Sequence, residues 1–95
     1  MIRLDGDALI LEGALTLATV SGLAAAVRDR LQQGAHVIDF RGVTEVDSAA
    51  VALALEWLRQ AAESGSALRL TNLPAAMQNL AKLYGVSELL QPASS

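Results

Sequence analysis

The chain has no cysteine, only three aromatic residues and no excess of positive charge. The lack of cysteine excludes disulfide bonds and thiolate chemistry. A formal net charge of −3 without a basic cluster argues against nucleic acid as a partner. No stretch approaches the roughly 18 consecutive apolar residues of a membrane span, and the first residues lack the pattern of a secretory signal. These absences favour a soluble, cytoplasmic protein without direct membrane insertion.

The chain is rich in aliphatic residues. Hydrophobic residues make up 53% of its 95 positions, which is enough to build one small core without metals or disulfides. We therefore expect a single domain over 1–95, with a disordered tail from about residue 92.

Strand-like and helix-like patterns alternate along the chain and predict the order β-β-α-β-α-β-α. The strand-like runs cover 2–4, 8–12, 36–40 and 67–71, and the helical periodicities cover 17–33, 48–64 and 75–84. The turn residues Asp5-Gly6-Asp7 predict an antiparallel edge hairpin from the first two strands. The later strand–helix–strand steps predict parallel crossovers. The expected fold class is α/β, a four-stranded mixed sheet with an antiparallel edge strand and three main helices.

Three local expectations accompany this topology. The run Val37–Phe40 is typical of a strand covered on both faces, and a short loop should follow it as far as Val46. Gly13 is interpreted as a bend after the second strand. In the second helix, the apolar spacing assigns the core face to a stripe that leaves Trp57 on another flank. The residues of that stripe are Val51, Ala52, Leu55, Leu58 and Ala62.

Residue types that could support catalysis are scarce. His36 is the only histidine, and it lies with Asp39 on one short strand, where about 3.3 Å of rise per residue keeps both from converging on Ser48. The carboxylates Asp39 and Asp47 lack the further oxygen ligands that a divalent cation needs. No glycine-rich loop leads into Lys-Ser or Lys-Thr. We expect no enzyme, no cofactor and no metal.

The start of the second helix is the segment where we expect function. Asp47 or Ser48 is suited to cap this helix with a side-chain oxygen. A phosphoryl group on Ser48 would add about −1.5 to −2 charges and disrupt a contact surface there. Trp57, the only tryptophan, is either a partner anchor or a half-buried residue at the edge of the core.

Three segments carry a resemblance to a known family, the STAS domains of sulfate transporters and anti-sigma-factor antagonists. Their signature, a strand ending in Asp, a short loop, and Asp-Ser/Thr-Ser/Gly-Gly-Leu at a helix start, is similar to Asp39 followed by 47–51. The segment 12–16, with Gly13, resembles the family's approach to its first helix. Leu-Ala-Lys-Leu-Tyr-Gly at 80–85 is similar to the third helix of the MlaB-type branch, a subunit of a bacterial phospholipid-trafficking ABC transporter.

The resemblance implies a non-catalytic subunit that binds the transporter ATPase, and through it the membrane permease, in maintaining outer-membrane lipid asymmetry. It would be cytoplasmic and peripheral to the inner membrane through its partner. The partner-binding residues would be Asp47, Ser48, Ala49, Val51, Trp57 and Tyr84. The alternative is an anti-sigma-factor antagonist that binds a serine kinase. In those proteins the phosphorylated hydroxyl is the second residue after the Asp, where this chain has Ala49, so Ser48 would be the candidate phosphorylation site.

Overall fold

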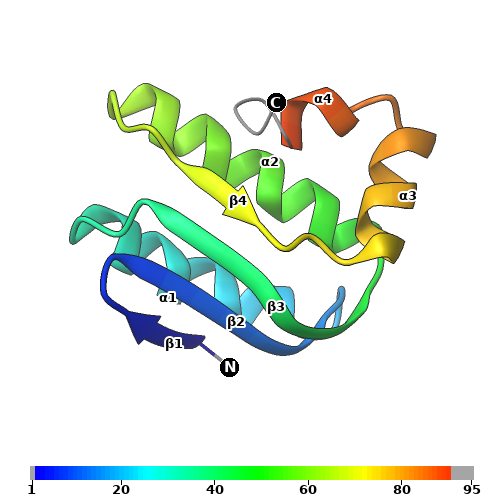
Figure 1. Cartoon of the computed structure of the whole chain (residues 1–95), viewed down its shortest axis with the longest axis horizontal. Coiled ribbons are helices and arrows are strands. Elements are labelled where there is room, and N and C mark those ends of the chain that lie inside the picture. Colours follow the sequence, from blue (N-terminus) through cyan, green and yellow to red (C-terminus); the bar gives the residue numbers. More distant parts are fainter. Residues whose placement is uncertain (1, 91–95) are drawn as a thin grey trace.

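An antiparallel hairpin comes first, and a helix, two strand–helix pairs and a short last helix follow it (Figure 1). The computed structural model describes residues 2–90. The strands are β1 (Ile2–Asp5), β2 (Ala8–Leu15), β3 (Val37–Val46) and β4 (Arg69–Thr71), and the helices are α1 (Val20–Gln32), α2 (Ser48–Glu63), α3 (Ala75–Leu83) and the one-turn α4 (Ser87–Leu90). The tail expected from residue 92 lies outside the described residues.

The strands form one sheet in the order β1-β2-β3-β4. β1 and β2 are antiparallel, whereas β2 pairs in parallel with β3, and β3 with β4. Gly6 joins the hairpin with φ of 64°, a left-handed conformation that two-residue hairpin turns require and that glycine adopts without strain. The predicted α/β fold with a mixed sheet, an antiparallel edge strand and three main helices is confirmed.

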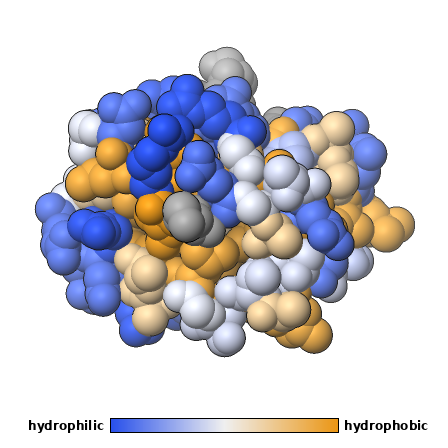
Figure 2. Space-filling view, turned by 90° about the horizontal axis from the view of Figure 1, so that it is seen from below, coloured by the Kyte–Doolittle hydropathy of each residue, from blue (hydrophilic) through white to orange (hydrophobic). Residues whose placement is uncertain are grey.

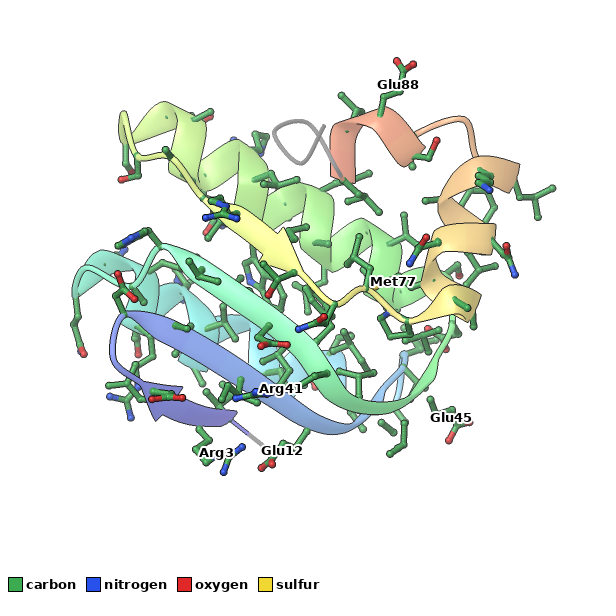
Figure 3. The ribbon with its side chains drawn as sticks, in the orientation of Figure 1. Arg3, Glu12, Arg41, Glu45, Met77 and Glu88 are labelled. Carbon is green, nitrogen blue, oxygen red and sulfur yellow. The ribbon has the colours of Figure 1, made fainter. Side chains whose placement is uncertain are left out.

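The core lies between the helices and one face of the sheet. Leu9, Leu11, Ile38 and Phe40 alternate along β2 and β3 with residues of the opposite face, and they pack with buried side chains of the helices such as Met77. Figure 1 shows α1 and α2 behind the sheet, and Figure 3 shows Met77 between α3 and the rest of the core.

The opposite face of the sheet carries charged side chains. Arg3 of β1 forms an ion pair with Glu12 of β2 at 3.6 Å, and Figure 3 shows the two side by side. Arg41 of β3 lies 3.9 Å from Asp5, and both side chains are more than half exposed. Val37 and Asp39 lie on this face and are only partly buried, so the expectation that Val37–Phe40 is covered on both faces was wrong.

The third strand is longer than predicted. Residues 41–46, expected to be a loop, continue β3 and pair with the second half of β2. The register shifts twice along this pairing, and Gly13 sits at the second shift with φ of 93°, inside β2 rather than at a bend after it. At Gly42 a Cβ atom would lie 2.8 Å from the carbonyl oxygen of Leu11, so the two strands approach closely there.

Helix α2 buries a different stripe from the predicted one. Its buried residues are Ala50, Val51, Ala54, Trp57 and Ala61, so Val51 is the one residue of the predicted stripe that is fully buried, whereas Leu55 and Leu58 pack against the core in part. Ala52 and Ala62 are exposed, and the large residues Leu55 and Leu58 are only partly buried. Three alanines, Val51 and Trp57 thus face the core, while Leu53, Leu55 and Leu58 pack against it from the flanks of the helix.

Candidate functional site

Asp47 links the start of α2 to the loop between β2 and α1. It is the N-cap residue of α2, and one carboxylate oxygen accepts a hydrogen bond from the Ala49 N–H at 2.9 Å. The other oxygen accepts from the Leu17 N–H at 3.0 Å. Of the two residues suited to capping, Asp47 therefore caps the helix, and Ser48 is its exposed first residue.

Several internal hydrogen bonds hold the loop that Asp47 contacts. The hydroxyl oxygen of Thr19 accepts from the Thr16 N–H at 2.9 Å and lies 3.0 Å from the carbonyl oxygen of Ala14, to which it can donate. The N–H groups of Thr19 and Val20 both donate to the Thr16 carbonyl oxygen at 2.9 Å. These bonds fix the backbone, yet the side chain of Leu17 is 76% exposed.

An open groove of about 700 Å³ runs over the first half of α2. Ser48, Ala52 and Leu55 of α2 line it. Leu17 lines it from the loop before α1, Val20 from the first turn of α1, and Tyr84 and Val86 from the connection between α3 and α4. Tyr84 is 50% exposed. Figure 2 shows hydrophobic surface at the right-hand end of the molecule, the end at which α3 lies.

Most of the residues predicted to bind a partner converge on this groove. Asp47, Ser48, Ala49 and Tyr84 line it, and Val51 lines it while being only 3% exposed. Trp57 does not: it is 1% exposed and belongs to the core, so the interpretation of Trp57 as a partner anchor was wrong.

The sequence did not single out Leu17 as part of the site. Leu17 is three residues before Val20, in phase with the apolar face of the first helix, and periodicity therefore gives no sign that its side chain is exposed. In the sequence, Leu17 is the first residue of the predicted helix 17–33, whereas the structure begins α1 at Val20 and leaves Leu17 in the preceding loop.

The charged residues of the groove are acidic. Besides Asp47 they comprise Glu56, whose pKa is lowered by a hydrogen bond from Arg59 and further by one from Gln60. Arg59 also bonds Glu63, and both carboxylates raise the pKa of its guanidinium. The cation nearest in sequence to Glu56 is thus already paired within α2.

The family match covers nearly the whole chain. Residues 2–91 match the family described as "Mlab, STAS domain". The chain belongs to the STAS domain family. No curated protein matches the sequence of this STAS domain.

Solved structures share the fold at low sequence identity. The anti-sigma factor antagonist SpoIIAA in its unphosphorylated form aligns with a TM-score of 0.69 and 20% identity, over 92% of this chain and 81% of that chain. A Thermotoga maritima protein described as an anti-sigma factor antagonist, tm1081, aligns with a TM-score of 0.74 and 18% identity, over 96% and 82%. Mglu aligns with a TM-score of 0.59 and 19% identity over 79% of this chain, which spans 20% of that chain.

Asp39 of this STAS domain has a role in the sheet rather than in the groove. Its carboxylate accepts from the Arg41 N–H at 2.8 Å and from the Asn72 side-chain amide at 3.0 Å. It thereby ties β3 to the segment that follows β4, where Asn72 has φ of 54°. β3 continues past Phe40 as far as Val46, so the expected end of this strand at residue 40 was wrong.

His36 lies at the opposite end of β3 from the groove. Its Nε2 is 2.9 Å from a carboxylate oxygen of Asp7, and its Nδ1 is 3.3 Å from the carbonyl oxygen of Gly34. The partners of His36 and Asp39 are thus unrelated to Ser48. Within residues 2–90, no three His, Asp or Glu side chains gather as a metal site, and no helix is long and apolar enough to span a bilayer.

Proposed function

We propose that this STAS domain is a non-catalytic subunit that binds the ATPase of a phospholipid-trafficking ABC transporter and supports outer-membrane lipid asymmetry. The observation that carries the proposal is the groove on α2, where Asp47, Ser48, Ala49 and Tyr84 meet. The family description names Mlab, and the helix-three segment 80–85 supports the same branch.

The groove suits a protein partner better than a small polar ligand. Its lining is mostly apolar, it is open, and Leu17 and Tyr84 expose large apolar areas that a protein surface would cover. Docking would shift the conformational equilibrium of the ATPase only as far as the domain binds one conformation more tightly than another. ATP hydrolysis by the partner would supply the work, and the partner would hold the domain at the cytoplasmic face of the inner membrane beside the permease.

Affinity purification of the tagged full chain from its native cells in mild detergent tests the proposal. The co-purifying proteins are identified by mass spectrometry against an untagged control. Recovery of an ABC ATPase together with its permease is the expected result. Recovery of a serine kinase or sigma-factor regulator in their place would contradict it.

A second candidate is an anti-sigma-factor antagonist that is regulated by serine phosphorylation. Two observations favour it: the similar structures described as such antagonists, and the exposed Ser48 at the start of α2. Ala49 counts against it, because it has no hydroxyl at the position that the family phosphorylates. Incubation with a co-purified kinase and ATP, read by intact mass, would support this candidate if one phosphoryl group appears on the wild type and none on Ser48→Ala.

A further inference from the structure

We propose that the outer edge of β1 pairs antiparallel with β1 of a second copy of this chain, so that the two sheets join across a two-fold axis. In this register Leu4 lies opposite Leu4 of the second copy, and Arg3 lies opposite its Asp5. The inference concerns self-association and goes beyond the proposed function. Its main tests need only the purified chain, so their failure leaves the proposed function untouched.

The outer edge of β1 is free to take another strand. β1 is the last strand at its end of the sheet, and within residues 2–90 no strand pairs with its outer side (Figure 1). Leu4 is 52% exposed there, although its partner across the hairpin, Leu9, is fully buried. The unpaired backbone groups of an edge strand are a template for pairing with another chain. A second strand would satisfy these groups and cover part of Leu4.

The backbone groups of Leu4 point outward from this edge. The carbonyl oxygen of Asp7, just before β2, accepts from the His36 N–H on the β3 side. Backbone groups alternate in direction along a strand, so those of Ala8 point toward β1 and meet its register partner Asp5. Those of Leu4, one residue earlier, therefore point away from β2. Two Leu4 residues placed opposite each other would exchange two N–H···O=C bonds, as in a hydrogen-bonded antiparallel pair.

The charges of β1 select this register. The side chains of Arg3 and Asp5 lie on the open face of the sheet and are 59% and 74% exposed. A two-fold axis at Leu4 places Arg3 of each copy opposite Asp5 of the other, so the contact contains this pair twice. An axis moved by one residue, to Arg3 or to Asp5, would set like charges directly opposite each other, which is unfavourable. The charges that discourage the neighbouring registers thus favour this one.

The contact would be small and the dimer weak. β1 has only four residues, so the strand pairing buries little area, and we expect a dimer that forms at high concentration rather than an obligate one. Within the chain, Arg3 pairs with Glu12 at 3.6 Å and Asp5 lies 3.9 Å from Arg41. Joining the two edges would extend these pairs into a row of alternating charge, from Glu12 and Arg3 to Asp5 and Arg41 of the second copy.

Charge reversal tests the register. In sedimentation equilibrium, the mass of the wild-type chain should rise from monomer toward dimer with concentration. Arg3→Asp and Asp5→Arg each set like charges opposite each other in both pairs, and each should weaken self-association at least about tenfold. An equimolar mixture of the two variants again has Arg opposite Asp in every pair, so it should recover most of the wild-type association. A wild type that stays monomeric up to about 1 mM, or a mixture that associates no better than either variant, would overturn the inference.

Cysteine crosslinking tests the position of the axis. The chain has no cysteine, so Leu4→Cys carries a single thiol. In a hydrogen-bonded antiparallel pair the Cα atoms are about 5.5 Å apart, which is within the reach of a disulfide. Leu83→Cys is the control, because Leu83 is more exposed than Leu4, at 76%, and lies in α3. Under mild oxidation of the purified chains, Leu4→Cys should form the disulfide-linked dimer several-fold faster, whereas equal rates would contradict the proposed axis.

The same variant distinguishes a second copy from another occupant of the edge. Oxidation of a native-cell extract that contains the full chain with Leu4→Cys should give the self-crosslinked dimer, identified by mass spectrometry. Crosslinking to a different protein, without any self-crosslinked chain, would assign the edge to that protein and overturn the inference.

Discussion

The carboxylate of Asp47 accepts hydrogen bonds from Leu17 and Ala49, at 3.0 and 2.9 Å, and so joins the β2–α1 loop to the start of α2. Asp47→Ala removes both bonds. We expect a loss of about 1 kcal/mol or slightly more in unfolding free energy, the usual contribution of an N-cap. Urea denaturation followed by circular dichroism measures it. Asp47→Ser, which retains a capping oxygen, should recover most of the loss; equal losses in both variants would refute the capping role.

Substitution of glycine by alanine is expected to change stability in opposite directions at Gly42 and Gly22. Gly42→Ala places a Cβ 2.8 Å from the Leu11 carbonyl oxygen, and forcing these strands apart should cost about 1–3 kcal/mol. Gly22 lies in the first turn of α1 with no atom within 4 Å of its added Cβ, so Gly22→Ala should stabilise the fold by about 0.5 kcal/mol. Thermal unfolding of both variants decides the comparison. A neutral Gly42→Ala would show that the strands do not approach so closely.

Trp57 is expected to serve stability and not recognition. Trp57→Ala should cost about 3–5 kcal/mol, as for other large aromatic side chains removed from a core. The native fluorescence should be blue-shifted and resist quenching by iodide. Trp57→Phe, if folded, should bind the partner like the wild type. A red-shifted, readily quenched emission would place the indole in solvent instead.

The Glu56–Arg59 pair predicts a small dependence of stability on pH. The pKa of Glu56 is lowered in the folded state from its ordinary value of 4.5, mainly by the Arg59 hydrogen bond. The stabilisation is therefore present above that ordinary value and is lost as pH falls through the lower folded pKa. Glu56→Gln should therefore have a lower melting temperature than the wild type at pH 7. This difference should disappear in acid, and also in high salt, because salt screens exposed ion pairs. A melting-temperature difference that persists at low pH would assign the effect to another cause.

Topology was predictable because each element has a strong local signal. The Asp5-Gly6-Asp7 turn fixes the hairpin, and the parallel steps follow from alternating strands and helices. The second half of β3 was missed because Arg41, Gly42, Thr44 and Glu45 look like a polar loop. In a sheet with one face open to solvent, such residues are accommodated within a strand, and the pairing with β2 is a long-range contact that local patterns do not contain.

The site was only partly predictable for a similar reason. Asp47 and Ser48 have a local signal, because short polar residues mark helix starts. The buried face of α2 was misassigned because 49–58 is apolar nearly all round, so periodicity alone cannot choose between Ala54 and Leu55 for the core. The hydrogen bond from Leu17 to Asp47 joins residues 30 positions apart and depends on the folded arrangement.

The central claim, that the start of α2 docks the transporter ATPase, is tested most directly by quantitative co-purification of the ATPase with Ser48 variants. Ser48→Lys and Ser48→Glu place long charged side chains in the groove, and Ser66→Lys is the control, since Ser66 is exposed beyond the far end of α2. We predict that both Ser48 variants fold normally and recover at least about tenfold less ATPase, while Ser66→Lys recovers the wild-type amount. Equal recovery with all three variants would contradict the claim.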